Sequence, residues 1–339
     1  MGALVLSAAM TGAVRKFALS RGVLDIPNQR SSHTVPIPRG GGTSIVVVTT
    51  AGLLILGCRG NVPWSLVAAL GGGGLVVALV GFLDDRSALP AGIRLLAHLG
   101  AASWAVIWLG APSALQVGHA VVELGYAGKL IAVLGIAWSL NLFNFMDGID
   151  GIAGSQAVFV TGGAAWLTSL SQGSHDLVTL EVIVAAASAG FLAWNWPPAR
   201  IFMGDVGSGY LGYTIGVLAI ASARETPAAL WPWLILDGVF LVDSTVTLLR
   251  RLMRGERIYE AHRTHAYQWQ ARRLASHLSV TVAVTLINVL WLLPSARAAS
   301  NRPEHSLWIA VGSLAPLTFL AAFLGAGRSE VAVLRGQKR

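Results

Sequence analysis

Apolar runs about as long as a membrane is thick alternate with short polar segments along the whole chain. A spanning helix needs about 20 mostly apolar residues. Eleven segments approach or reach that length, at 1–19, 43–58, 63–82, 92–110, 129–146, 152–170, 178–196, 206–223, 228–250, 277–294 and 305–326. Arg15 and Lys16 interrupt the first, which is either a short span or the end of one that starts further upstream. The pattern predicts an all-α polytopic membrane protein with about 10–11 transmembrane helices.

The composition agrees with this prediction. Of the 339 residues, 54% are hydrophobic and 12% are charged, whereas soluble domains carry about 25% charged residues. A net charge of +8 would suggest nucleic acid as the partner of a soluble protein. Here we expect it to reflect basic cytoplasmic loops, with no nucleic-acid partner. The single cysteine, Cys58, excludes an intramolecular disulfide. We expect one integral-membrane domain over residues 1–339.

Basic residues are divided unevenly between the two sets of alternating loops. The first set comprises 20–42, 83–91, 147–151, 197–205, 251–276 and the C-terminal tail, and with the adjoining helix ends it holds 19 of the 24 Lys and Arg residues. The second set holds Arg59, Lys129, Arg224, Arg297 and Arg302. The positive-inside rule makes the first set cytoplasmic, with the N-terminus outside and the C-terminus inside.

Nearly every unusual polar motif falls in this cytoplasmic set, within the segments 20–42, 83–91, 141–151, 195–209 and 251–276. The third segment reads NLFNFMDGIDG and places Asn141, Asn144, Asp147 and Asp150 at three-residue intervals. Such steps drift only about 60° round a helix, so the two amides can share a face. Polar groups at the end of a membrane span are candidate functional groups. The alternative is a helix end that these residues merely cap.

The first two segments offer phosphate donors and a carboxylate pair. Five donors suit phosphate oxygens, although a basic loop that binds anionic headgroups is the alternative. They are Arg30, Ser31, Ser32, His33 and Arg39. In GFLDDR, the adjacent Asp84 and Asp85 could bind a divalent metal, act as a base or remain solvated. Crowding of like charges raises one carboxyl pKa, which would help a base.

The last two segments add a glycine-rich turn and a histidine motif. In NWPPARIFMGDVGS, Asn195 ends a span, Phe202 could stack on a flat base and Asp205 lies among glycines. A carboxylate there suits magnesium, which takes one or two carboxylates and leaves other positions to water and phosphate; the alternative is a glycine-rich helix start. In HRTH, His262 and His265 form a weak zinc signal. Phosphate contact or proton donation fits them better, unless they are inert.

Several other titratable residues receive no role: His98, Glu123, His175, Asp176, His277 and His305. Asp237 and Asp243 lie inside a predicted span and are expected at most to support the site. The remaining parts suit magnesium-assisted chemistry on a nucleotide diphosphate with a lipid partner, because phosphoryl transfer mainly needs positioning and charge neutralisation.

Five motifs, in this order, resemble those of the polyprenyl-phosphate N-acetylhexosamine-1-phosphate transferases (glycosyltransferase family 4), which include the lipid I synthase of peptidoglycan. They are DIPNQRSSH with PIPRGGG, GFLDD, NLFNFMDGIDG, FMGDVGSGYLGY and HRTHAYQ. The resemblance covers about residues 20–275. It implies that undecaprenyl phosphate attacks the β-phosphorus of a UDP-N-acetyl-amino sugar and releases UMP. It also implies Mg²⁺, or alternatively Mn²⁺, and a bacterial inner membrane location with the site facing the cytoplasm; a homodimer is left open.

The resemblance assigns roles at matching positions. The catalytic set comprises Asp84, Asp85, Asp147, His262 and His265, with Asp205 and Asp147 as metal ligands. The substrate-binding set comprises Arg30, His33, Arg39, Asn141, Asn144, Asp150, Asn195, Phe202 and Arg263. Asn195 and Phe202 match positions that contact uracil, and the histidine motif matches the binding site of the phosphate or sugar end.

The departures favour one branch of the family. The lipid I synthase usually has a third aspartate beside the pair and three histidines, whereas this chain has Arg86 and HRTH. We therefore expect initiation of O-antigen or another surface glycan, with lipid I synthesis as the alternative. Many relatives have a lysine where Ser31 or Ser32 stands, so the pyrophosphate contact is expected from Arg30 or Arg39. A secondary transporter is the rival class, although transport sites lie near the midplane of the bilayer.

Overall fold

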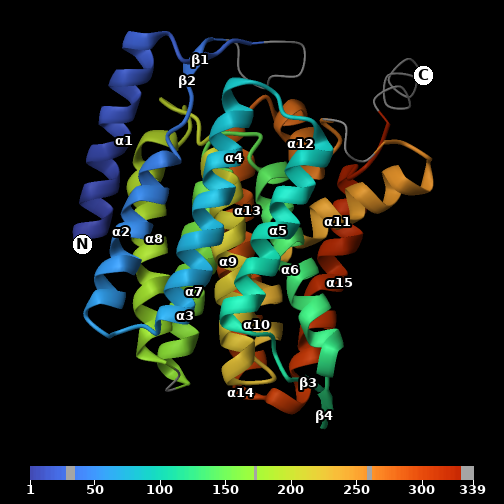
Figure 1. The fold of residues 1–339 in the computed structure, drawn as a ribbon. Coiled ribbons are helices and arrows are strands. Elements are labelled where there is room, and N and C mark those ends of the chain that lie inside the picture. The colour runs from blue at the N-terminus through green and yellow to red at the C-terminus, as the bar shows by residue number, and fades with distance from the viewer. Residues whose placement is uncertain (28–34, 172–173, 258–261, 330–339) are drawn as a thin grey trace, which may run out of the picture.

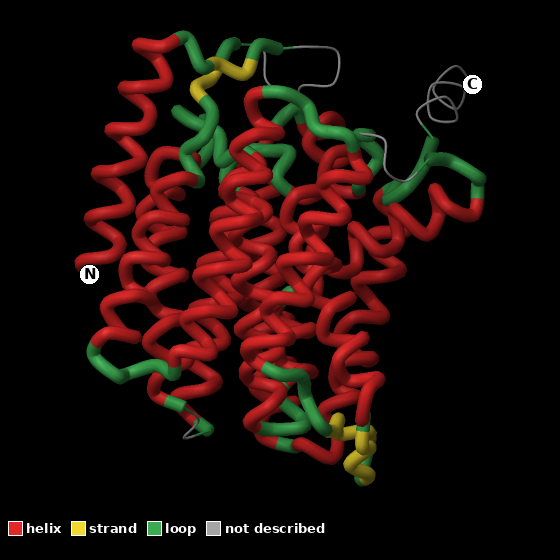
Figure 2. Tube along the Cα trace, in the orientation of Figure 1, coloured by secondary structure: helices red, strands yellow, loops and turns green. Residues whose placement is uncertain are grey.

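The computed structural model describes residues 1–27, 35–171, 174–257 and 262–329. Helices form most of the regular structure (Figures 1 and 2), which confirms the all-α prediction. The helices are α1 (Gly2–Arg21), α2 (Thr43–Cys58), α3 (Trp64–Ala68), α4 (Gly74–Arg86), α5 (Ala91–Leu109), α6 (Gly125–Met146), α7 (Ile152–Leu170), α8 (His175–Asn195), α9 (Asp205–Glu225), α10 (Leu230–Leu236), α11 (Gly238–Met253), α12 (Ala266–Leu274), α13 (His277–Ile287), α14 (Leu293–Asn301) and α15 (Ser306–Leu324).

Short segments complete the architecture. Two π-helical turns, η1 (Ala69–Gly73) and η2 (Asn288–Leu292), join α3 to α4 and α13 to α14, and a 3₁₀ turn, η3 (Pro303–His305), precedes α15. Two antiparallel strand pairs, which the hydropathy pattern did not predict, lie in loops. They are β1 (Leu24–Asp25) with β2 (Ile37–Pro38) and β3 (Ala114–Val117) with β4 (Ala120–Glu123).

The predicted spans all coincide with helices. Eight helical segments of the described chain are long and apolar enough to cross a membrane, and a bent pair would make nine. That pair corrects one prediction, because the single span expected over 228–250 is broken at Asp237, where α10 and α11 meet at 77°. α2 has only 16 residues. The chain is a multi-pass membrane protein.

The polar loops grouped by charge lie at one end of the bundle. Figure 1 places β1, β2, the C-terminal end of α4 and α12 together at its top, and β3, β4 and α14 at the opposite end. The described parts of the motif-bearing segments therefore share one end. We call it the site end; that it faces the cytoplasm remains a prediction.

Helix α9 forms the centre of the bundle and begins at the site end. Some 94% of the residues in its most apolar stretch are buried, and the helix packs closely against α4 and α6. Close packing requires glycine, because a Cβ at Gly212 would lie 2.5 Å from the Ser139 carbonyl oxygen of α6. Small residues let membrane helices approach backbone to backbone. The packing thus fixes where α9 starts relative to the ends of α4 and α6.

Candidate active site

The carboxylate pair ends α4 directly beside the start of α9. A Cβ at Gly81 would lie 2.5 Å from the Asp205 carbonyl carbon, so only glycine lets the last turns of α4 reach this backbone. The Asp85 carboxylate accepts hydrogen bonds from the backbone N–H groups of Asp205 (2.9 Å) and Val206 (3.3 Å). Free N–H groups at a helix start attract negative charge. Asp85 thus caps α9 from another helix.

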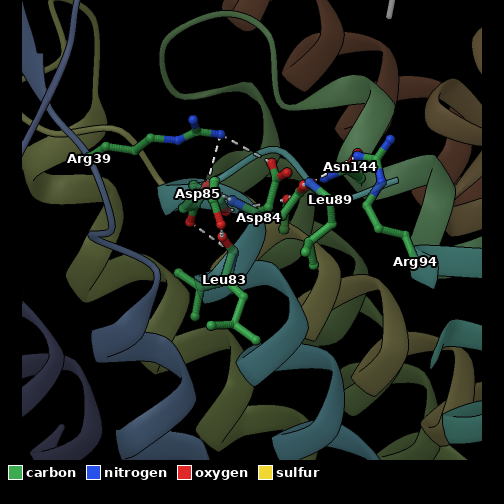
Figure 3. A network of polar contacts seen from close by, with 12 residues as sticks. Arg39, Leu83, Asp84, Asp85, Leu89, Arg94 and Asn144 are labelled. Carbon is green, nitrogen blue, oxygen red and sulfur yellow. Dashed lines mark hydrogen bonds and ion pairs between the residues drawn. The ribbon is translucent and has the colours of Figure 1, made fainter. Parts of the chain in front are cut away.

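Arg39 joins the two motifs electrostatically. Its Nη2 lies 2.8 Å from Asp85 Oδ1 and 3.3 Å from Asp205 Oδ1 (Figure 3). The backbone around Arg39 is fixed, because Phe202 N–H donates to the Pro38 carbonyl (2.8 Å) and Gly41 N–H donates to the Phe202 carbonyl (2.9 Å). Arg39 therefore holds a cation beside two carboxylates, where a phosphate could also be reached.

Asp84 lines a cavity together with Asp205. Its carboxylate accepts the Leu89 N–H (2.6 Å) and pairs with Arg94 Nη1 of α5 (2.9 Å; Figure 3). The cavity has a volume of about 710 Å³. Its polar wall consists of Asp84, Arg94, His98, Asn141, Asn144 and Asp205. The remaining lining residues are mostly apolar and come mainly from α4, α5, α6 and α11. The cavity therefore combines charged side chains with a large apolar surface.

The polar residues at the end of α6 lie near the same carboxylates. Asn144 Nδ2 lies 3.3 Å from the Ser208 hydroxyl in the first turn of α9. Asp147 follows the last residue of α6. Burial raises the pKa of Asp147 to about 7, and the neighbouring Asp205 carboxylate adds to the shift. The structure therefore brings Asp84, Asp147 and Asp205 together at one end of the bundle.

Two predicted ligand residues instead hold loops together. Asp150 is buried; its Oδ2 accepts the Ala199 N–H (3.0 Å) and its Oδ1 lies 3.2 Å from His277 Nδ1. Asn195 is 3% exposed; it accepts the Gly151 N–H (2.9 Å) and donates to the Ile201 carbonyl (2.9 Å). These contacts join the 147–151 turn to residues 196–204. Direct contact of either side chain with a nucleotide stays a prediction.

The histidine motif docks on the end of α6. The rings of His262 and His265 stack at 5.0 Å, and the Phe145 ring lies 6.2 Å from His265. His265 is only 1% exposed. Burial, followed by the neighbouring His265, lowers the pKa of His262 to about 3, so this imidazole is neutral at neutral pH. His262 can therefore offer a hydrogen bond to a substrate but not a positive charge.

The remaining predicted site residues are placed as follows. Asn141 Nδ2 donates within its helix to the Ala137 carbonyl (2.6 Å), and the side chain lines the cavity. The backbone carbonyl of Arg263 accepts a hydrogen bond from Arg272 Nη2 (2.9 Å). Arg30 and His33, with Ser31 and Ser32, lie outside the described residues. His277 received no role in the sequence analysis, and no local pattern marks it.

No three His, Cys, Asp or Glu side chains converge on a metal position within the described ranges. Magnesium does not require such a cluster, because it usually keeps several waters and binds one or two carboxylates together with substrate phosphates. Asp205 and Asp147 fit that demand, since both are carboxylates at the site end and Asp205 lies close enough to Asp147 to help raise the pKa of Asp147. They stay the predicted ligands.

Comparison with known proteins bears on this geometry. The model of the family described as Glycosyl transferase family 4 matches residues 66–223. A probable undecaprenyl-phosphate N-acetylglucosaminyl 1-phosphate transferase of Bacillus subtilis is 30% identical over 312 residues, covering 89% of this chain and 83% of the relative. The chain belongs to glycosyl transferase family 4.

Other members of family 4 are similar over comparable lengths. An undecaprenyl-phosphate alpha-N-acetylglucosaminyl 1-phosphate transferase of Yersinia pestis is 28% identical, covering 84% of this chain and 79% of its own. A phospho-N-acetylmuramoyl-pentapeptide-transferase of Moorella thermoacetica is also 28% identical, covering 76% of this chain and 84% of its own. The family membership and these relatives make the chain a membrane-bound glycosyl-1-phosphate transferase.

Proposed function

We propose that the protein transfers N-acetylhexosamine-1-phosphate from a UDP-sugar to undecaprenyl phosphate and thereby initiates O-antigen or another cell-surface polysaccharide. The observation that carries this proposal is that Asp84 and Asp205 line a largely apolar cavity while Asp147 lies close enough to Asp205 for that carboxylate to raise its pKa. A lipid phosphate needs both features, because its chain is apolar and its head is an anion. The names of the relatives support the same substrates.

In the proposed reaction, an oxygen of the lipid phosphate attacks the β-phosphorus of the UDP-sugar. The bond from this phosphorus to the bridging oxygen breaks, and UMP leaves with the electron pair. A bound Mg²⁺ would neutralise the charge on the diphosphate. Asp205 and Asp147 would hold this ion, and Arg39 would bind a diphosphate oxygen. Phe202 would stack on uracil.

On the acceptor side, Arg94 would bind the lipid phosphate. It lies 2.9 Å from Asp84 at the charged end of the cavity. Since a phosphate is already an anion, Asp84 need not act as a base, and it can instead fix Arg94 in place. Asp85 was expected to be catalytic; its contacts with the start of α9 favour a positioning role.

Peptidoglycan lipid I synthesis is the closest alternative, and the Arg86 and HRTH departures argue against it. A secondary transporter would use polar groups in a broken helix near the membrane centre. The break at Asp237 is such a feature, and Gln156 of α7 contacts it (3.3 Å). However, the described charged motifs gather at the site end instead.

The test is an assay of purified protein in detergent with undecaprenyl phosphate, Mg²⁺ and a panel of UDP-amino sugars. We expect UMP release that requires both the lipid and the divalent ion. Proteoliposomes of known orientation would locate the site, since a cytoplasmic site requires the UDP-sugar on that side. Uptake of substrate without UMP release would favour a transporter and overturn the proposal.

A further inference from the structure

A second carboxylate at the site end has contacts that parallel those of Asp85. Asp243 lies in α11, is 5% exposed and accepts hydrogen bonds from the first two N–H groups of α12. Its Oδ1 accepts the Ala266 N–H (2.9 Å), and its Oδ2 accepts the Tyr267 N–H (3.0 Å). Asp85 makes the same pair of bonds to Asp205 and Val206 at the start of α9. Two helix starts of the site are thus each capped by a carboxylate from another helix.

The helix that Asp243 caps carries the histidine motif to the end of α6. His265 directly precedes α12, and its Nδ1 lies 3.5 Å from Asp243 Oδ1. Tyr267, in the first turn of α12, donates its hydroxyl to the Phe145 carbonyl (2.9 Å). The Phe145 ring then packs against the ring of His265. A continuous set of contacts therefore runs from Asp243 to the last turn of α6.

These contacts end at Phe145, close in the chain to Asp147, which is a proposed ligand of the metal ion that would bind the diphosphate. Phe145 precedes Asp147 by two residues, and a Cβ at Gly148 would collide with the Tyr267 hydroxyl. A shift of the start of α12 would therefore move the histidines away from the end of α6, which Asp147 directly follows. In this arrangement each carboxylate oxygen accepts one N–H group, whereas an amide in the same orientation would present a donor to one of them.

We propose that Asp243 is a positioning residue of the transferase: it fixes the start of α12 so that His262 and His265 stack beside Phe145 at the end of α6. This deepens the proposed function, on which its kinetic consequence rests. The spatial part of the inference stands on the contacts alone.

The first experiment measures the histidine motif directly. The protein in detergent is labelled with diethylpyrocarbonate, and each histidine is followed by mass spectrometry. Asp243→Asn should raise the labelling rate of His265 at least about tenfold, as expected when charge-assisted bonds that close a loop are lost. His305, which is exposed and lies beside His119 of the β3–β4 turn at the opposite end, should keep its rate. Wild-type protection of His265 in Asp243→Asn would overturn the proposal.

Ser244→Ala provides the matched control. Ser244 is the next residue of α11, is fully buried, and its hydroxyl has no partner among the described residues. This variant should label as the wild type does; equal deprotection in both variants would show general loosening of α11 and refute a specific role for Asp243. If Asp243→Asn does not fold, Tyr267→Phe decides, since it removes only the hydroxyl that binds the Phe145 carbonyl and lies close to Gly148. It should deprotect His262, and unchanged labelling would refute the inferred set of contacts.

Kinetics separate positioning from a loss of folded protein. Asp243→Asn should lower kcat by at least about tenfold and leave the KM for undecaprenyl phosphate unchanged. The reason is that no residue of α12 lines the cavity in which Arg94 would bind the lipid phosphate. Equal changes in the parameters of both substrates would contradict the proposal. If the wild type itself releases no UMP, the proposed function fails, while the labelling result still judges the position of the histidines.

Discussion

Helices α9 and α15 are similar in length, but the less apolar of the two, α9, is the more buried. The α9 segment has a mean hydropathy of 1.3 and is 94% buried, whereas the segment that contains α15 reaches 2.0 and is 22% buried. In water the more apolar helix would be the buried one. In a bilayer, lipid tails solvate apolar side chains as well as a protein core does. Burial of a span therefore indicates close packing and polar contacts, and hydropathy alone does not predict it.

The contrast extends to function. α9 begins with Asp205 at the site end, and glycines along its length admit α4 and α6. Among the described residues, α15 leaves large apolar side chains such as Phe319 and Phe323 exposed on the outside of the bundle. Paired substitutions in or beside the two helices test whether this division of roles is real.

The largest effect is expected at the start of α9. Asp205→Asn should lower UMP release about 100-fold or more, because loss of a residue that merely supports a metal ligand already costs about 10–100-fold. Glu304→Gln, which removes an exposed carboxylate just before α15, should leave the activity unchanged. Both variants should be folded by size-exclusion chromatography. Full turnover by Asp205→Asn would refute the metal assignment.

Glycine substitutions test the packing of the two helices. Gly212→Leu should lower the thermal transition strongly, because its Cβ would meet the Ser139 carbonyl oxygen at 2.5 Å and overpacking typically costs about 1–3 kcal/mol or more. Gly312→Leu in α15 should be near neutral, since no heavy atom lies within 4 Å of the added Cβ. A fluorescence-detected melting curve in detergent measures both. Similar transitions for the two variants would argue that α9 is not the packed centre.

An aromatic pair tests substrate contact. Phe202→Ala should raise the KM for the UDP-sugar about tenfold, since stacking on a base is worth about 1–3 kcal/mol. Phe319→Ala in α15 removes a ring that is 76% exposed and should change neither KM nor kcat. Initial-rate kinetics at saturating undecaprenyl phosphate provide the comparison. An unchanged KM in Phe202→Ala would remove this ring from the nucleotide site.

The smallest effect concerns a buried hydrogen bond. The Tyr213 hydroxyl of α9 donates to the Ala69 carbonyl in the π-turn η1 (2.6 Å). Tyr213→Phe should destabilise the fold by about 1 kcal/mol, the usual net worth of such a bond. Thr318→Val removes an exposed intrahelical bond of α15 and should shift the transition less. If Thr318→Val were the more damaging variant, the assignment of the structural centre to α9 would be wrong.

The sequence predicted the helices and the site-bearing segments because both are encoded locally. Apolar length marks each span, and motif residues cluster where spans end. Within the 228–250 run, Asp237 followed by Gly238 was the available signal for the break between α10 and α11. The apolar residues on both sides of this two-residue signal made the run look like one continuous span.

Individual roles were harder to predict because they depend on partners far away in the chain. Asp85 meets a backbone N–H 120 residues later, and Asn195 meets one 44 residues earlier. A carboxylate or amide that caps backbone and one that binds a ligand have the same residue type. Asp243 was expected at most to support the site, and only the packing of α11 against α12 shows what it contacts.

The size of the acceptor cavity has a consequence for tail-length tolerance. Its volume of about 710 Å³ lies within the range of about 300–1,000 Å³ found for pockets that hold drug-sized molecules. In the proposed reaction, an undecaprenyl tail is larger than such a molecule, so most of it would remain among the neighbouring lipids. Isoprenoid phosphates with considerably shorter chains should therefore be accepted as substrates almost as well, provided that their first isoprene units cover the apolar lining of the cavity beside Arg94.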